Sequence, residues 1–271
     1  MKLRKKWQDV IFWSLVVLFG GILIYALVHI GEWFVNSKDT LEEIEKIQEN
    51  VLIEEQDNNL TEVIEPQEEI LEDNPYWDYI KMNLINVDFT ELKKVNTDVV
   101  GWIEVKGTNI NYPFVQGKDN EYYLSHSFNK SYNKAGWVFL DYRNKGTDNK
   151  NTIIYAHGRN DKTMFGSLKN IFSNGWLKNK DNYVVRISTE SENSLWQVFS
   201  VYKVPTTSDY LQMDFINDDE FWKFGNMLKD RSVFDFGTVV EKTDRILTLS
   251  TCYNNTEKVV LHAKLIKRST K

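Results

Sequence analysis

The C-terminal stretch Arg245-Ile246-Leu247-Thr248-Leu249-Ser250-Thr251-Cys252 leads into the polar turn Tyr253-Asn254-Asn255-Thr256. The aliphatic and β-branched residues of this stretch favour an extended strand, and the turn residues that follow end it. Cys252, the only cysteine in 271 residues, therefore lies at the end of a predicted strand and next to a loop. A thiol in this place can meet a substrate, although free cysteines are often buried as small hydrophobic residues. Position alone leaves both interpretations open.

Other segments also predict strands. A hairpin is predicted where 99–105 and 110–115 flank a Lys-Gly-Thr-Asn turn. Further predicted strands are 136–140, 152–156, 183–187, 195–204, 245–251 and 259–266; helices are predicted near 163–172 and 218–231, with earlier helix starts at Asn74 and Asp88. About eight short strands with few helices predict a mainly β fold, a closed or nearly closed β-barrel.

The N-terminus predicts a membrane anchor. The run from Val10 to Ile30 contains no Asp, Glu, Lys or Arg, and about 20 such residues cross a ~30 Å hydrocarbon layer as a helix. Bulky Trp33 and Phe34 follow it, in place of the small-residue cleavage site of a secretory signal peptide. We therefore expect an uncleaved single-pass anchor at 10–30 in the cell membrane. Because residues 1–9 are rich in basic side chains, they are expected to stay cytoplasmic while the remainder lies outside.

Charge is distributed unevenly along the chain. Residues 38–75 carry most of the acidity that gives the chain its formal net charge of −6. Their high charge and few aromatic residues predict that 31–73 is a solvated acidic stalk, whereas apolar residues at helical spacing between 41 and 51 leave a partner-binding helix as the alternative. The folded domain is predicted to span 74–271. It has no basic block interleaved with aromatic residues, which argues against a nucleic acid partner.

A cysteine nucleophile needs a base or cation beside it, because a thiol with a pKa near ~8.5 is mostly protonated at neutral pH. The chain has four histidines. His29 belongs to the predicted anchor, His126 to a predicted loop, and His262 lies inside a predicted strand, where a structural role is usual. His157 ends a predicted strand and precedes a polar loop, which is the same placement as Cys252. His157 is therefore the leading candidate partner, with a structural strand-end histidine as the alternative.

The sequence predicts no metal and no cofactor. A single cysteine and scattered histidines lack the spacing of a zinc site. No glycine-rich phosphate loop or dinucleotide fingerprint is present. Outside the membrane, Cys252 has no intramolecular disulfide partner, which leaves burial, pairing with another chain, or use of its reactivity.

Several segments resemble the sortases, the membrane-anchored cysteine transpeptidases of Gram-positive surfaces. Residues 248–252 match the TLxTC signature of that family, and 151–157 followed by 163–168 resembles its histidine segment. The likeness is closest to class B and runs from about 76 to 268. It is also carried by 89–92, 100–103, 112–117, 120–124, 141–144 and the predicted helix at 218–231.

The resemblance implies a sortase β-barrel with N-terminal helices and a helix before the last two strands. It implies that Cys252 attacks the threonyl carbonyl of a C-terminal sorting signal on a surface protein, which is cut after Thr. An amine of a cell-wall precursor or of a pilin would then resolve the thioacyl enzyme. His157 would serve first as general acid and then as base. Likeness to class B suggests a sorting signal of the Asn-Pro-x-Thr type.

One position departs from the family pattern. Sortases use an arginine on the last strand, thought to steady the substrate and the oxyanion, and alignment of 259–265 places Lys258 there. Lysine keeps the charge but lacks the planar fork of donors. Arg245 and Arg268, the nearest arginines in sequence, do not match the motif. We expect Lys258 to supply the cation, together with backbone N–H groups; the alternative is an ordinary strand-edge lysine.

Other functions fit less well or stay open. A peptidase of the NlpC/P60 type would place its cysteine before its histidine, and an L,D-transpeptidase would show a Gly-Cys segment; neither pattern is present. The departure at Lys258 keeps open a non-catalytic, membrane-anchored sortase-like module that binds cell-wall peptides. Ser250 and Thr251 are expected either to support the surroundings of the thiol or to be structural.

Overall fold

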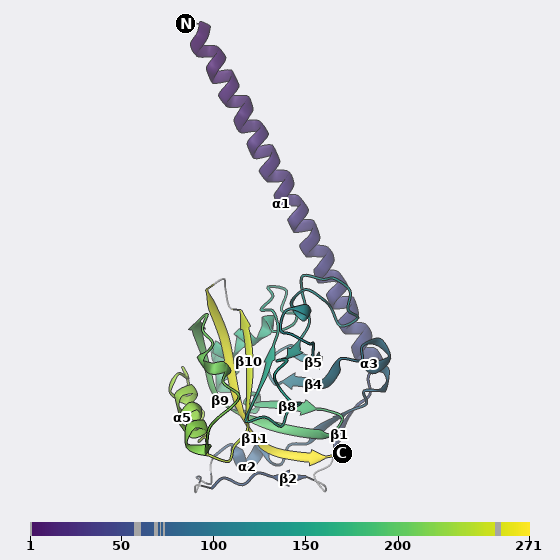
Figure 1. Cartoon of the computed structure of the whole chain (residues 1–271), viewed down its shortest axis with the longest axis vertical. Coiled ribbons are helices and arrows are strands. Elements are labelled where there is room, and N and C mark those ends of the chain that lie inside the picture. Colours follow the sequence, from purple (N-terminus) through teal and green to yellow (C-terminus); the bar gives the residue numbers. More distant parts are fainter. Residues whose placement is uncertain (1, 57–60, 68–69, 71, 73, 253–255) are drawn as a thin grey trace.

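The computed structural model describes residues 2–56, 61–67, 70, 72, 74–252 and 256–271, without the side chains of 2–5 and 252. A long N-terminal helix leads to a β-barrel body with short helices around it (Figure 1). The helices are α1 (Lys2–Asn50), α2 (Tyr76–Tyr79), α3 (Thr90–Val95), α4 (Asn174–Lys178) and α5 (Asp218–Asp230), with 3-10 turns η2 (Tyr122–Leu124), η3 (Gly166–Phe172), η4 (Lys180–Asn182) and η5 (Asp209–Leu211). The strands are β1 (Ile53–Gln56), β2 (Glu62–Val63), β3 (Leu84–Val87), β4 (Val99–Val105), β5 (Asn111–Val115), β6 (Phe139–Leu140), β7 (Asn151–Tyr155), β8 (Val184–Ser188), β9 (Glu192–Pro205), β10 (Ile246–Cys252) and β11 (Glu257–Thr270).

The main sheet closes on itself. Among the described residues, its strands follow the order β10-β7-β6-β5-β4-β8-β9-β11-β2, and β10 also pairs with β11. This pairing closes the ring and leaves β2 outside it. The β10–β7 and β5–β6 pairs are parallel, and the other pairs in the ring are antiparallel. The predicted closed barrel of about eight strands and the predicted hairpin of β4 and β5 are confirmed.

Strand β10 is buried on both faces, which explains its nearly continuous apolar run. Leu247 and Leu249 belong to the core inside the barrel. Ile246 belongs to a second apolar cluster outside the barrel, beneath Phe221 and Phe224 of α5. Residues that alternate along a strand point to opposite faces, so the barrel interior and the α5 layer each take every second residue.

Helix α5 begins and ends close to its predicted bounds. The side chain of Asn217 accepts a hydrogen bond from the backbone N–H of Glu220 and so caps the first turn. Three acidic residues in that turn stabilise the helix, because their negative charges lie at the positive end of the helix dipole. Phe221, Phe224 and Leu228 lie on one face at helical spacing and cover β10 from outside.

The structure corrects the prediction that residues 31–73 form a solvated stalk and that the folded domain begins at residue 74. Helix α1 continues without interruption to Asn50, and Thr40, Ile44 and Ile47 are buried against the body. Strands β1 and β2 then pair with β3 and β11, so part of the predicted stalk belongs to the folded body. The apolar residues at helical spacing therefore mark a face that docks on this chain's own barrel.

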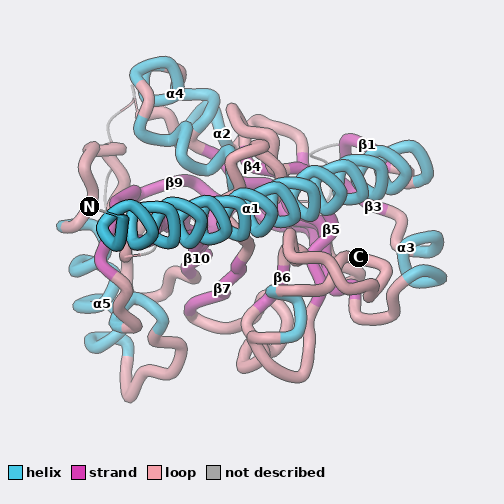
Figure 2. Tube along the Cα trace, turned by 90° about the horizontal axis from the view of Figure 1, so that it is seen from above, coloured by secondary structure: helices cyan, strands magenta, loops and turns pink. Residues whose placement is uncertain are grey.

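The N-terminal half of α1 agrees with the predicted anchor in length and composition. Within the described residues, α1 is the one helix long and apolar enough to cross a membrane. Seen from above, α1 overlies the body in projection, with its N-terminal end over the side of β9 and β10 and its C-terminal end at the side of β1 and β3 (Figure 2).

Candidate active site

The ends of β7 and β10 lie side by side at one rim of the barrel. The two strands are parallel neighbours, and their last register pair joins Tyr155 to Ser250. His157 and Cys252 each lie two residues beyond this pair. Adjacent strands are about 4.8 Å apart, so the backbone brings these two positions together. The side chain of Cys252 and the turn 253–255 lie outside the described residues.

Lys258 lies at the same rim. In the antiparallel pairing of β10 and β11, Lys258 is directly opposite Cys252, and on its other side it pairs with Val204 of β9. Arg245 and Arg268 lie toward the other ends of these two strands, where each approaches Glu192 at 3.6 Å. Of these three basic residues, only Lys258 is close to the two strand ends.

His157 is held in a defined orientation. Its half-buried ring makes a 2.8 Å hydrogen bond from Nε2 to the carbonyl oxygen of Leu124 in η2. Because a carbonyl can only accept, Nε2 carries a hydrogen, and in the neutral ring Nδ1 is the nitrogen that can take up a proton. The backbone carbonyl of His157 accepts a hydrogen bond from the N–H of Phe165 at 3.0 Å. This bond joins the two ends of the loop between these residues.

The other histidines have different surroundings. His262 is fully buried, accepts from the hydroxyl of Tyr202 at 2.8 Å and contacts Thr248 Oγ1 at 2.9 Å. Burial, and secondarily the charge of Arg231, lowers the pKa of His262 to about 3, so the ring is neutral and structural. His126 stacks on Tyr122, with ring centroids 4.0 Å apart, in the same loop region as Leu124.

The residues just before Cys252 tie β10 to its surroundings. The hydroxyls of Ser250 and Tyr210 are 2.9 Å apart and buried. Thr251 is also buried, and within the described part of the chain its hydroxyl has no hydrogen-bond partner. Ser250 therefore has a clear packing role, and the structure assigns none to the Thr251 hydroxyl.

A buried carboxylate fixes the end of β7. Asp141 receives two hydrogen bonds from the guanidinium of Arg143, at 2.9 and 2.8 Å, and one from its backbone N–H at 3.0 Å. It also receives one from the hydroxyl of Tyr155 at 3.0 Å and one from Asn120 at 3.1 Å. Burial by itself would raise the pKa of Asp141, but the hydrogen bonds from Arg143 and Tyr155 lower it. The cluster keeps Tyr155, two residues before His157, in a fixed place.

The sequence profile of the sortase domain matches residues 103–266. Sortase B of Staphylococcus aureus is 36% identical to this chain over 190 residues, which are 68% of this chain and 77% of that protein. The chain belongs to the sortase family. Its fold and relatives group it with class B, and its function is that of a sortase cysteine transpeptidase in cell-wall anchoring.

Solved class B sortases share the fold. A Bacillus anthracis protein described as similar to sortase B superimposes with a TM-score of 0.66 and 34% identity, covering 87% of this chain and 97% of that one. A substrate complex of the S. aureus sortase B gives a TM-score of 0.61 and 38% identity, covering 66% and 84%.

In this sortase, the loop after His157 contains an ion pair that reaches α1. Asp161 Oδ2 lies 2.6 Å from Arg159 Nη2 and accepts the hydroxyl of Ser37 at 2.7 Å. Gly166 permits the close packing of this loop, since a Cβ there would lie 2.1 Å from the carbonyl oxygen of Arg159. Sequence reasoning missed this contact, because no local pattern connects Ser37 to a residue 124 positions away.

Asp161→Asn is expected to destabilise the protein by about 2 kcal/mol at neutral pH. Burial opposes ionisation of Asp161, but hydrogen bonds from Arg159, Thr163 and Ser37 lower its pKa from 3.8 to about 2. A depressed pKa in the folded state stabilises the fold above about pH 4, and this stabilisation is lost as the pH falls toward 2. Urea unfolding at several pH values should show the two proteins converging in that window. Asp78→Asn, at a side chain 81% exposed, is the control and should change stability little.

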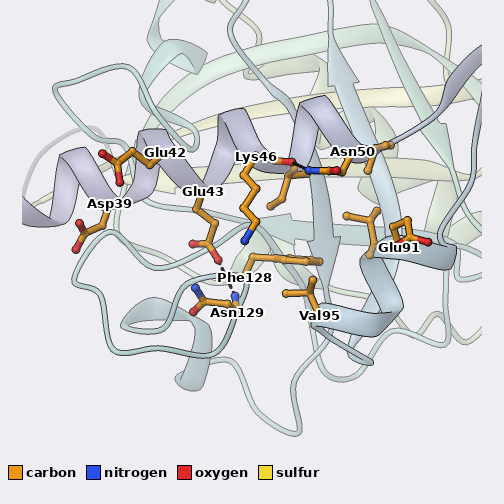
Figure 3. Close-up of a pocket in the computed structure, with 12 residues that line it drawn as sticks. Asp39, Glu42, Glu43, Lys46, Asn50, Glu91, Val95, Phe128 and Asn129 are labelled. Carbon is orange, nitrogen blue, oxygen red and sulfur yellow. Dashed lines mark hydrogen bonds between the residues drawn. The ribbon is translucent and has the colours of Figure 1, made fainter.

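A separate pocket lies where α1 meets the body (Figure 3). Its volume is about 460 Å³, and it lies between α1, α3 and residues 128–129. Glu43 on α1 accepts the backbone N–H of Asn129 at 2.8 Å across this junction. His157 and Lys258 do not line it, so it is distinct from the candidate active site.

Proposed function

We propose that this sortase cuts a C-terminal sorting signal after Thr and transfers the protein to an amine, with Cys252 as nucleophile and His157 as general acid and base. The observation that supports this assignment is the parallel register of β7 and β10, which sets the two strand ends next to each other. Lys258 joins them because it is the register partner of Cys252.

The proposed reaction has two halves. The thiolate of Cys252 attacks the threonyl carbonyl, and His157 gives a proton to the departing amine as the C–N bond breaks. A thioester between the threonyl carbonyl and the sulfur remains. The incoming amine then attacks this carbonyl, His157 takes its proton, and the thiolate leaves. Protons and bonds balance over the cycle, so no cofactor is needed.

The proposed substrates are inferred from the sortase family, and the proposed membrane contact is inferred from the apolar half of α1. We infer a sorting signal of the Asn-Pro-x-Thr type, and as acceptor an amine of a cell-wall precursor or a pilin. The apolar half of α1 supports a single-pass anchor at 10–30, with the N-terminus in the cytoplasm and the barrel outside.

The direct test is a search for the thioester. Full-length protein in vesicles is mixed with a set of sorting peptides, with and without a small amine, and mass spectrometry follows the mass of the protein. We expect an acyl adduct on Cys252 that disappears when the amine is added. A non-catalytic module would bind the peptides without forming any adduct. A shorter soluble form should begin before Asn36 and not at 74, because residues 36–48 of α1 contact the barrel.

Lys258→Ala is expected to reduce turnover by about 10²- to 10³-fold, the usual effect of removing one oxyanion donor. Lys258 is directly opposite Cys252 in the strand register, and no arginine takes this place on β10 or β11. Steady-state transpeptidation rates measure the effect. Lys203→Ala is the control, because Lys203 is a cation on the neighbouring strand that lies 5.1 Å from the ring of Phe172. Full turnover in Lys258→Ala would remove Lys258 from the mechanism.

A further inference from the structure

The body of the protein meets α1 very close to the end of the predicted membrane span. The ammonium group of Lys134 lies 2.7 Å from a carboxylate oxygen of Glu32. Glu32 follows Ile30, where the apolar run ends, by two residues, or about 3 Å along a helix. The headgroup layer on each side of a bilayer is about 5–7 Å thick. The ammonium group of Lys134 therefore lies at the level of the headgroups when α1 spans the membrane.

The exposed side chains near the end of the predicted span belong to residue types that favour the membrane–water interface. Tyr132, two residues before Lys134, is 66% exposed. On α1 itself, Trp33 and Phe34 are 41% and 63% exposed although they follow the predicted span. Tyrosine and tryptophan favour the membrane–water interface, and lysines near the membrane are attracted to anionic headgroups.

The predicted membrane span and the part of α1 that contacts the body belong to one uninterrupted helix. Helix α1 is continuous from the apolar run to Asn50. Asn133 donates to Thr40 Oγ1 at 3.1 Å, and the N–H of Asn129 donates to Glu43 at 2.8 Å. Ser37 donates to Asp161 at 2.7 Å. These contacts fix both the height and the rotation of the barrel about α1.

We propose that the side chains of Tyr132 and Lys134, which we call the bilayer-contact loop, reach the lipid headgroups of the membrane that α1 spans. The end of β10 and the start of β11 lie on the side of the body from which the N-terminal half of α1 projects (Figure 1). The rim that carries His157, Cys252 and Lys258 is thereby turned toward the bilayer surface. The inference depends on the proposed anchoring of α1.

Fluorescence quenching in vesicles tests this contact. Cys252 is the only cysteine, so Cys252→Ser gives a full-length background in which one new cysteine carries an environment-sensitive fluorophore. Three positions are labelled in turn, through Tyr132→Cys, Leu52→Cys and Ile24→Cys. The vesicles contain phosphatidylcholine and phosphatidylglycerol, with a nitroxide on either the headgroup or the acyl chain. Leu52 is the matched control, since it is 59% exposed and follows Asn50, the last residue of α1, which lies about 30 Å beyond Ile30 at the helical rise.

We expect headgroup nitroxide to cause a clear loss of fluorescence at position 132 and little at 52, and acyl-chain nitroxide to quench the label at 24. Quenching at 24 with none at 132, or equal quenching at 132 and 52, would overturn the bilayer-contact loop and leave the anchor standing. Absence of quenching at 24 would overturn the anchor, and the inference with it.

Discussion

Cys252→Ala is expected to abolish both the acyl adduct and all transfer of the sorting peptide to an amine. The chain has no second cysteine that could replace the thiol. Serine and threonine hydroxyls near the rim are far weaker nucleophiles without an adjacent base that activates them. Intact-protein mass spectrometry after incubation with peptide should show only the unmodified mass, and product formation should fall to the rate without enzyme.

Two controls separate loss of chemistry from loss of fold. The Cys252→Ala protein should still bind the sorting peptide and should unfold at the same urea concentration as the parent. Ser250 lies two residues before Cys252 in β10, and its hydroxyl contacts that of Tyr210. The Ser250→Ala protein, which lacks this contact, should still form the acyl adduct. An acyl adduct on the Cys252→Ala protein would place the nucleophile elsewhere and refute the assignment.

Much of the barrel was predictable from local pattern. The run at 245–251 contains apolar residues on both faces, and the structure explains this by a core on one side and α5 on the other. The hairpin of β4 and β5 follows from two strand-forming runs around a turn whose glycine has φ of +72°. Closure through the pairing of β10 with β11 joins strands adjacent in sequence, which is the most common arrangement.

The docking of α1 was not predictable in the same way. Acidic residues dominate 38–75, and their density predicted a solvated segment. A helix that docks on one side needs only a narrow apolar stripe, however, and Thr40, Ile44 and Ile47 supply it while the acidic side chains face outward or pair with the body. Which surface receives that stripe depends on residues far away in sequence, such as Asn129 and Asn133.

The candidate site was also only partly predictable from the sequence. The placement of His157 and Cys252 at strand ends was readable from the sequence, but their adjacency depends on β7 and β10 being parallel neighbours. Strand order is a property of the whole barrel, and a run of apolar residues does not specify it. The bond from His157 to Leu124 is equally remote, because it links two residues 33 positions apart.

His157→Ala is expected to lower kcat/KM by about 10²- to 10⁴-fold, the range for loss of a general acid and base. Without the imidazole, the departing amine receives no proton and the incoming amine loses none in the transition state. Transpeptidation rates measure the loss, and alkylation of Cys252 by a thiol probe at neutral pH should also slow. The control is His126→Ala, a nearby loop histidine that stacks on Tyr122, which should stay within a few-fold of the parent.

His157→Gln separates chemistry from architecture. The observed ring donates Nε2–H to Leu124 O, and a glutamine amide can make the same bond, yet it cannot carry a proton to or from the substrate. If the histidine served only to hold η2 against the end of β7, the glutamine variant would remain active while the alanine variant failed. We expect both to fail equally and free imidazole in solution to restore part of the activity of His157→Ala, because only a missing proton carrier can be replaced from outside.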